Sequence, residues 1–291
     1  MGLYQQTEKL EEAEGLDPVA ETVQGAVKAV IRPGRLKDVL SGTWLGHPVH
    51  PLLVSAPIGA WLSATLLDLT GGHESEKAAD RLVGAGVLAA LPTAASGAAD
   101  WSDTLAGERR IGLVHALGNY AAVALMGASW VARRRGRRSL GVGLSLTGDV
   151  VVGAAGYLGG HLAYNQGVGV DTTAFETGPE EWTAVASEVN VLEGEPSGVD
   201  VDGVRLVLIR RDAELFALAA RCTHRGGPLD EGTLEDGCIV CPWHKSAFRI
   251  DDGSVVRGPA VTPQPAYEVR AVDGMIEVRR REPKGLRTAA V

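Results

Sequence analysis

The chain has 291 residues, enough for two domains, and 45% of them are hydrophobic. The net charge of −8 is unevenly spread, because acidic residues gather in the first 21 positions and after Asp171, while arginines in the middle flank apolar stretches. This distribution excludes a basic nucleic-acid-binding surface, so no nucleic acid partner is expected. Three cysteines are too few for a disulfide framework.

The N-terminal region divides into a polar tail and an amphipathic helix. Residues 1–16 are polar and acidic, which predicts a disordered tail, and they lack the apolar core of a signal peptide. Asp17-Pro18 is a favourable helix start, and apolar residues recur at helical spacing from Val19 to Ile31 before Pro33-Gly34 ends the pattern. Residues 17–45 are therefore predicted to be an amphipathic helix and its lead-in, lying on the membrane or packed on other helices.

Four long apolar stretches follow within residues 46–163, at about 52–69, 82–99, 111–132 and 140–163. Each approaches or exceeds the ~18 to 20 residues that cross a bilayer core. We predict an all-α bundle of four transmembrane helices in the cell membrane, with the lipid bilayer as its partner. A soluble helical core is the weaker alternative, since helices that are apolar all round are rare outside membranes. Asp149, deep in the fourth stretch, is either a proton relay or a neutral acid bonded within the bundle.

The first span is preceded by Gly46-His47-Pro48-Val49-His50-Pro51. Together with the four spans, this stretch resembles an uncharacterised bacterial membrane family whose members open with a Gly-His-Pro-x-His-Pro signature, over roughly residues 40–165. The resemblance implies no activity. Similar positions of His50 and His115 near the starts of spans one and three indicate either a duplicated two-helix unit or a chance likeness.

Four histidines are predicted to gather at one membrane face. Because consecutive spans alternate in direction, the face that carries the C-terminal region also holds His47, His50, His115 and His161. Taken singly, each is most simply a helix cap or a contact to lipid headgroups. Taken together, they are a candidate second site for haem b, another metal or quinol, because ionisable groups at membrane depth tend to be functional.

Beyond the spans the composition changes. Residues 164–181 are rich in Gly and Thr without periodicity and are predicted to be a flexible linker, spanning roughly 20 to 25 Å. Residues 182–281 contain short β-type segments between turn signals such as Asp202-Gly203, Asp236-Gly237 and Asp273-Gly274, which predicts an all-β antiparallel domain. Residues 282–291 are predicted to be a disordered tail.

Two short motifs in this domain each combine a thiolate with an imidazole. They are Cys222-Thr223-His224 and Cys241-Pro242-Trp243-His244, separated by sixteen residues. Zinc motifs usually place like ligands in pairs, whereas here each loop is mixed. A [2Fe–2S] cluster with two thiolates on one iron and two imidazoles on the other needs loops of this mixed kind. A zinc site or unrelated buried residues are the alternatives.

The full pattern includes Gly226-Gly227-Pro228-Leu229 after the first motif, and Ser246 and Phe248 after the second, and it resembles the Rieske family. The resemblance implies that Cys222 and Cys241 bind an inner iron, that His224 and His244 bind an outer one, and that Ser246 donates to a cluster sulfur. Respiratory members carry disulfide cysteines at the positions of Gly227 and Trp243, and often a tyrosine at that of Phe248. Cys238 is then a buried strand thiol. Phe248 lacks the hydroxyl with which that tyrosine would donate a hydrogen bond to the cluster. This loss predicts a reduction potential in the lower or middle part of the Rieske range of about −150 to +300 mV.

These features predict a multi-domain protein, a membrane-anchored electron carrier and candidate oxidoreductase component. It would exchange electrons with quinone or with a haem or metal in the bundle, and with a redox protein partner. A redox sensor that regulates its membrane domain and a ferredoxin-like component of an oxygenase system are the alternatives. The arginine run 133–138, with a twin-arginine-like Arg137-Arg138-Ser139-Leu140, favours an extracytoplasmic Rieske domain, although the missing disulfide suits a reducing compartment.

Overall fold

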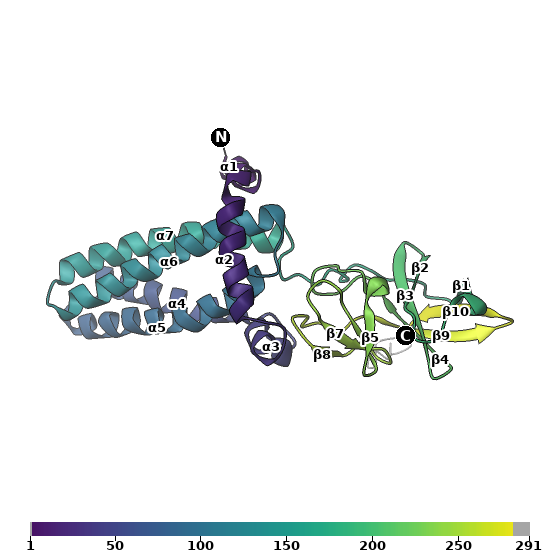
Figure 1. The fold of residues 1–291 in the computed structure, drawn as a ribbon. Coiled ribbons are helices and arrows are strands. Elements are labelled where there is room, and N and C mark those ends of the chain that lie inside the picture. Colours follow the sequence, from purple (N-terminus) through teal and green to yellow (C-terminus); the bar gives the residue numbers. More distant parts are fainter. Residues whose placement is uncertain (1, 282–291) are drawn as a thin grey trace, which may run out of the picture. The chain divides into compact units, whose positions relative to one another are not determined.

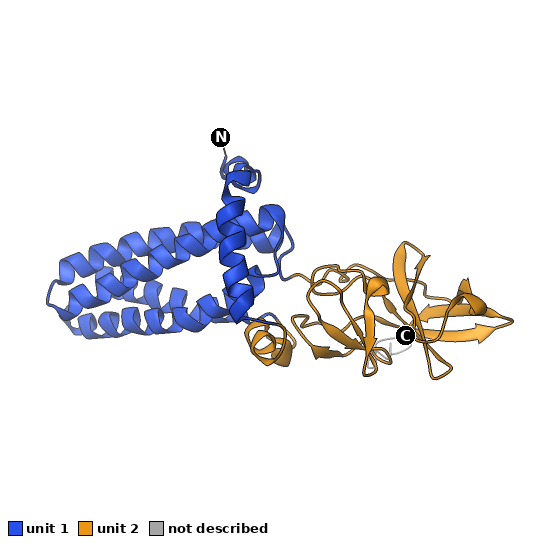
Figure 2. Cartoon of the chain, viewed as in Figure 1, with its two compact units in different colours: residues 1–32, 48–169 blue, residues 33–47, 170–291 orange. Residues whose placement is uncertain are grey.

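The chain folds into two compact units in a computed structural model that describes residues 2–281 (Figures 1 and 2). The first unit takes in the chain up to Arg32 and from Pro48 to Gly169, and the second takes in Pro33–His47 and the chain from Val170 onward. The predicted tail 282–291 lies outside the described residues. The first unit is helical and the second is rich in strands, which confirms the predicted fold class.

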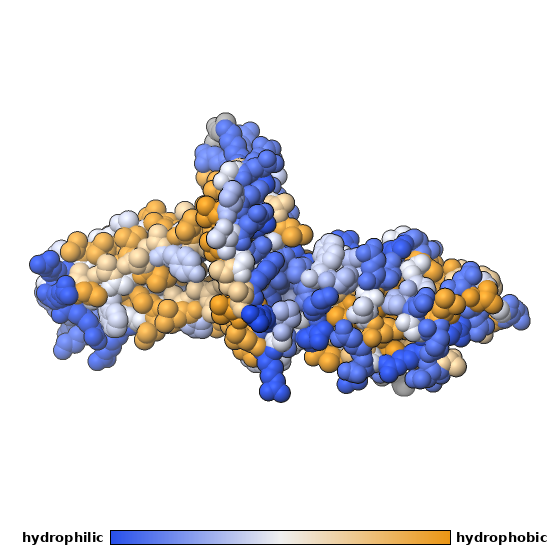
Figure 3. Space-filling view, viewed as in Figure 1, coloured by the Kyte–Doolittle hydropathy of each residue, from blue (hydrophilic) through white to orange (hydrophobic). Residues whose placement is uncertain are grey.

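Four long helices form the body of the first unit: α4 (Val49–Thr70), α5 (Glu76–Trp101), α6 (Ala106–Arg134) and α7 (Arg138–Tyr164). Each predicted span lies inside one of them, and all four are long and apolar enough to cross a membrane. Only 17% of the most apolar stretch of α4 is buried inside the protein, and at most 39% of any of the four. Apolar side chains therefore cover the outside of the bundle, as Figure 3 shows, which fits lipid contact rather than a soluble core.

Hydrophilic residues gather at the bundle end that holds the α4–α5 and α6–α7 connections (Figure 3). Arg133 has a fully buried side chain and donates to both oxygens of Asp68, which is only 1% exposed. Arg138 donates to Asp68 and to Asp80, and Arg133 also reaches Asp80. This shared ion-pair network closes the four helices at one end. Two arginines of the run 133–138 thus have carboxylate partners.

The N-terminal residues are not the disordered tail that their composition predicted. They form α1 (Leu3–Glu11) and the short η1 (Glu14–Leu16), followed by α2 (Asp17–Val30), which crosses the other end of the bundle (Figure 1). Arg110 donates to the backbone oxygen of Glu11 and to the carboxylate of Asp17. Gln24 of α2 is buried and donates to Thr104. Tertiary polar contacts with α6 and the α5–α6 loop, invisible in local composition, fix this segment.

The second unit contains two antiparallel sheets. The larger has the order β1-β10-β9-β4-β3-β2, and the smaller has the order β5-β6-β7-β8. Positive φ angles at Asp202-Gly203, Asp236-Gly237 and Asp273-Gly274 form the tight hairpin turns that the sequence indicated. A shared core of apolar residues, including Val207, Leu218, Ile239 and Phe248, packs beneath the cysteine-bearing loops. The strand bounds are β1 Thr183–Ser187, β2 Ser197–Val201, β3 Val204–Arg211, β4 Glu214–Ala219, β5 Thr233–Glu235, β6 Cys238–Val240, β7 Ala247–Arg249, β8 Val255–Arg257, β9 Ala266–Val272 and β10 Met275–Arg280.

Two segments outside the strands also belong to the second unit. Residues 33–47, expected to be part of a lead-in, contain α3 (Arg35–Ser41) and η2 (Thr43–Leu45) and pack on the β unit. The expected linker 164–181 joins the second unit from Val170 onward, where Thr172 donates through its backbone nitrogen to the oxygen of Thr223 and through its hydroxyl to the oxygen of Cys222. Asn165, Gln166 and Val168 bond back to α7, so the predicted linker is held at both ends and is shorter than its composition indicated.

Candidate metal centre

Two loops of the same construction carry the four candidate ligands. In the first, Cys222 donates its N–H to the oxygen of Gly227 and accepts from the N–H of Gly226. In the second, Cys241 donates its N–H to the oxygen of Ser246 and accepts from the N–H of Lys245. The residue four positions after each cysteine has a positive φ, +73° at Gly226 and +66° at Lys245. Each loop thus begins at a cysteine that follows a strand, β4 or β6, and turns back to bond with the backbone of that cysteine.

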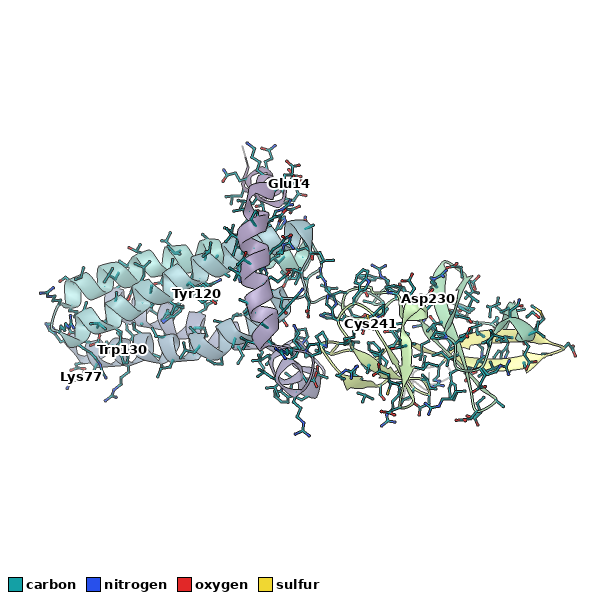
Figure 4. The ribbon with its side chains drawn as sticks, viewed as in Figure 1. Glu14, Lys77, Tyr120, Trp130, Asp230 and Cys241 are labelled. Atoms are coloured by element: carbon teal, nitrogen blue, oxygen red, sulfur yellow. The ribbon has the colours of Figure 1, made fainter. Side chains whose placement is uncertain are left out.

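The two loops bring the four side chains together. The Cys222 thiol donates a hydrogen bond to the sulfur of Cys241, and both residues are only 1% exposed. The rings of His224 and His244 have centroids 5.1 Å apart at an angle of 90°, and both are half-buried. The sulfur ligands therefore lie deep and the imidazoles lie nearer the surface. Figure 4 marks Cys241 within the β unit.

The sulfurs sit in backbone cradles suited to thiolates. The N–H groups of His224 and Arg225 are directed at Cys222, and those of Trp243 and His244 at Cys241. The hydrogen bond from Cys222 lowers the pKa of Cys241 to about 7, and the backbone donors act in the same direction. That same bond, followed by burial, raises the pKa of Cys222. Donor-rich pockets of this kind stabilise metal-bound thiolates.

The space around the sulfurs is tight, and glycine is required beside them. A Cβ on Gly227 would lie 2.8 Å from the sulfur of Cys241 and 3.1 Å from the Trp243 ring. A cysteine at this position, as in respiratory Rieske proteins, would need a different arrangement of the second loop. All three cysteines of the chain are free, and Cys238 is buried in β6, as predicted.

A third segment, residues 258–264, supports both loops. Ala260 donates its N–H to the hydroxyl oxygen of Ser246, a fully buried side chain, at 3.0 Å. This bond uses the oxygen as an acceptor and leaves the hydroxyl proton of Ser246 for another acceptor. Gln264 is buried and accepts from the N–H of Thr223 while donating to the oxygens of Ala219 and Arg221. The first loop therefore depends on one amide side chain.

Sequence reasoning missed this support. Gln264 lies in no catalytic pattern, and its role arises only because residues 258–264 fold back across the two loops. The sequence did contain one indication of this segment. Three closely spaced prolines, Pro259, Pro263 and Pro265, indicate a stiff segment that is not a strand. The buried pair of Arg133 and Asp68 was missed as well, because Arg133 was considered only as part of the arginine run 133–138.

The membrane histidines of the first unit, His50, His115 and His161, do not form a metal-binding group. Among residues 2–281, no three His, Cys, Asp or Glu side chains are grouped so as to hold a single metal ion. His161 pairs with Glu11 of α1 at 2.5 Å, and His47 belongs to the second unit. Two thiols and two imidazoles, as in the β unit, are the ligand types that a Rieske [2Fe–2S] centre divides between its two irons.

His50 and His115 have matching surroundings inside the bundle. The Nδ1 atom of His50 contacts the backbone oxygen of Thr93 at 3.0 Å, and a Cβ on Gly97 would touch its ring. The Nδ1 atom of His115 contacts the oxygen of Ala155 at 2.7 Å, and a Cβ on Gly159 would touch its ring. In each hairpin the second helix thus offers a carbonyl and, four residues later, a glycine. A carbonyl partner places the proton on Nδ1 and leaves Nε2 as the acceptor.

Asp149 occupies the middle of α7. One of its oxygens accepts a hydrogen bond from the hydroxyl of Thr65, and the other is buried without a partner among the described residues. A relay role for Asp149 stays a prediction.

These features define an iron–sulfur protein with a helical membrane domain, and comparisons with known proteins name both parts. Residues 181–268 match the family described as "Rieske [2Fe-2S] domain", and residues 46–172 match that described as "Predicted membrane protein (DUF2231)". The chain is 34% identical over 98 residues to the anthranilate 1,2-dioxygenase ferredoxin subunit of Burkholderia cepacia, covering 34% of this chain and 91% of that protein. It is 30% identical over 90 residues to the ferredoxin component of the naphthalene 1,2-dioxygenase system of Pseudomonas putida, covering 31% of this chain and 86% of that protein.

Among solved structures, the ferredoxin of carbazole 1,9a-dioxygenase from Nocardioides aromaticivorans IC177 is 28% identical, with a TM-score of 0.34, covering 35% of this chain and 100% of that one. Through its C-terminal domain the chain belongs to the Rieske [2Fe–2S] family, joined to a four-helix membrane domain. The predictions of a Rieske domain, a [2Fe–2S] cofactor and an electron-transfer role are thereby confirmed.

Proposed function

We propose that this protein takes electrons from membrane quinol and passes them singly to a redox protein, with Cys222, Cys241, His224 and His244 holding the [2Fe–2S] group. That group supplies a one-electron redox change when bound. The observation that carries the proposal is the pairing of two buried thiols with two surface-side imidazoles in a chain that also has four membrane-length apolar helices.

The polypeptide contributes position and electrostatics. The backbone donors around Cys222 and Cys241 stabilise negative charge on sulfur, and the hydroxyl proton of Ser246 is available for a further bond to it. The surface-side His224 and His244 give the shortest route for an electron to a partner, and an imidazole there can also exchange a proton. Trp243 is half exposed and stacks edge-on against His244, so it extends this contact surface.

Quinol is the proposed donor because the bundle holds acceptors suited to it. His50 and His115 each direct one ring nitrogen to a carbonyl, which leaves the other as a proton acceptor; at His115 that second nitrogen lies 3.2 Å from the side-chain amide nitrogen of Asn119, so a quinol hydroxyl would replace this contact. Neutral imidazoles with this second bond are also suited to bind haem iron, so a b-type haem in the bundle is the alternative electron donor. Visible spectra distinguish the two, since a haem gives a Soret band and a quinol does not.

The experiment uses the full chain in lipid nanodiscs with a reconstituted cluster. Excess quinol is added, and cluster reduction is followed by electron paramagnetic resonance. We expect the paired variant His50→Gln, His115→Gln to reduce at least tenfold more slowly, while His73→Gln, at a fully exposed histidine of the α4–α5 connection, is unchanged. Equal rates in all three proteins would contradict a role for the bundle histidines.

A second candidate follows from the relatives. Both curated relatives described above are named as ferredoxin components of dioxygenase systems, which favours a ferredoxin-like role here, with an oxygenase as the acceptor. In that case the same experiment gives no reduction by quinol but rapid reduction by a flavoprotein reductase.

We propose that the Rieske domain faces the outside of the cell. The run from Arg133 to Arg138 supports a cytoplasmic location for the α6–α7 connection, although Arg133 and Arg138 are engaged with Asp68. A protease-cleavable tag after Val291 tests this directly. Cleavage in intact cells is the expected result, and cleavage only after lysis would contradict it.

A further inference from the structure

Residues 33–47, here called the foot segment, precede the first membrane helix yet are built onto the β unit. Asp38 accepts a hydrogen bond from the N–H of Gly258 at 2.9 Å, and Thr43 donates its hydroxyl to the oxygen of Ala260 at 3.1 Å. A Cβ on Gly258 would lie 2.2 Å from the Thr43 hydroxyl. The polar side of the foot segment therefore fits closely against residues 258–260, which in turn support Ser246.

The other side of the foot segment is apolar and uncovered. Leu36 and Val39, one helical turn apart in α3, are 51% and 56% exposed. Trp44 is 67% exposed and its indole N–H donates to the backbone oxygen of Val39, so the large ring is held against the end of the helix. Leu45 continues the same exposed group. Four large apolar residues uncovered in a stretch of ten are costly in water.

The chain itself indicates what covers this surface. Pro48 follows the foot segment directly, and Val49 begins the first membrane-length helix. Only Pro48 separates the foot segment from a helix long enough to span the bilayer, so the foot segment must lie near the membrane surface. Tryptophan and leucines in one short segment that also carries the exposed Arg35 are the composition of a membrane–water interface.

We propose that the foot segment is an interfacial membrane anchor belonging to the Rieske unit, with Leu36, Val39, Trp44 and Leu45 inserted among lipid headgroups and upper acyl chains. One side of the foot segment binds residues 258–260 and the other binds lipid. The iron–sulfur domain is therefore attached to the bilayer surface by a segment of its own unit. The proposal depends on the membrane location of the bundle and not on quinol as the donor.

Lipid contact can be measured with spin labels. The full chain is placed in nanodiscs with single cysteines introduced at Val39 or Leu45, and at Val189 as the control. Val189 is 81% exposed and lies in η4 (Glu188–Asn190) of the same unit, outside the foot segment. The three native cysteines are buried, and the wild type labelled in parallel corrects for any reaction at them.

The readout is the ratio of collision rates with oxygen, which partitions into lipid, and with a water-soluble nickel complex. We expect this ratio to be at least threefold higher at positions 39 and 45 than at 189. Water-like ratios at all three positions would overturn the proposal, and so would an equally lipid-like ratio at 189, because the foot segment would then not be a distinct anchor. Visible absorption of the cluster confirms that each variant is folded, and Leu36→Cys replaces either foot variant that is not.

Discussion

Gln264 is the most informative single residue of the centre, because it holds the first ligand loop without touching a ligand. Its side chain is 1% exposed and makes three hydrogen bonds, with the N–H of Thr223 at 3.1 Å and with the oxygens of Ala219 and Arg221 at 2.7 Å each. Replacement by methionine keeps the volume and removes all three bonds. At a net value of about 1 kcal/mol for each bond, the domain should lose about 3 kcal/mol of unfolding free energy. The loss of unfolding free energy is larger if water does not hydrate the backbone groups that are left without a partner.

This prediction is checked by urea unfolding of the full chain in detergent, followed through the visible circular dichroism of the cluster, which reports the Rieske unit alone. A signal specific to one unit is needed because a two-unit protein does not unfold in one step. Thr233→Val is the control, since that hydroxyl is exposed and reaches only Glu235, at 3.4 Å. We expect it to change the free energy by less than about 0.5 kcal/mol. A change that small for Gln264→Met would refute the account of how the first loop is held.

Three further predictions concern the cluster, the bundle and the N-terminal helices. Ser246→Ala should lower the reduction potential by roughly 60 to 130 mV, because a hydrogen bond to a charged acceptor contributes about 1.5–3 kcal/mol; a redox titration in which it matches the wild type would contradict this. Arg133→Met should destabilise the bundle by about 3 kcal/mol in thermal unfolding, the lower end of the cost of breaking a buried pair, since the buried Asp68 loses the partner of one oxygen while Arg138 still pairs with the other; an unchanged midpoint would show that the network is not structural. The hydrogen bond from Arg110 lowers the pKa of Asp17 to about 2 in the folded protein, whereas the pKa in the unfolded chain is near 4. The stability that this ion pair contributes is therefore fully present above about pH 4 and is lost as the pH falls through about 2. Protease resistance of α2 should thus be constant from pH 7 to 5 in the wild type and lower throughout in Asp17→Asn; resistance that declines with pH in the wild type would contradict the assignment.

The parts of the fold that depend on local sequence pattern could be predicted. Four apolar stretches of membrane length predict four helices, because the bilayer sets a minimum length that few soluble helices meet without polar breaks. The proposal of Cys222, His224, Cys241 and His244 as ligands could be made from the sequence because the spacing of mixed ligands is specific in itself. The hairpin turns followed from Asp-Gly pairs, whose backbone readily adopts positive φ.

What the sequence did not reveal depends on contacts between distant segments. The polar composition of residues 3–11 predicts disorder, yet α1 is held by Arg110, ninety-nine residues away from its partner Glu11. The foot segment was expected to lead into the membrane bundle and is instead bonded to residues 258–260 through Asp38 and Thr43, across more than two hundred residues. Local propensity contains no information on such pairings, and they decide which unit a segment joins.

The central claim is that two loops share one asymmetric two-iron centre, and the most direct test is a combined chemical and spectroscopic assay of the purified full chain. Two irons and two labile sulfides per chain, with a reduced-state electron paramagnetic resonance signal that couples to two histidine nitrogens, is the predicted result. A preparation that retains zinc alone, or a signal without nitrogen coupling, would contradict it.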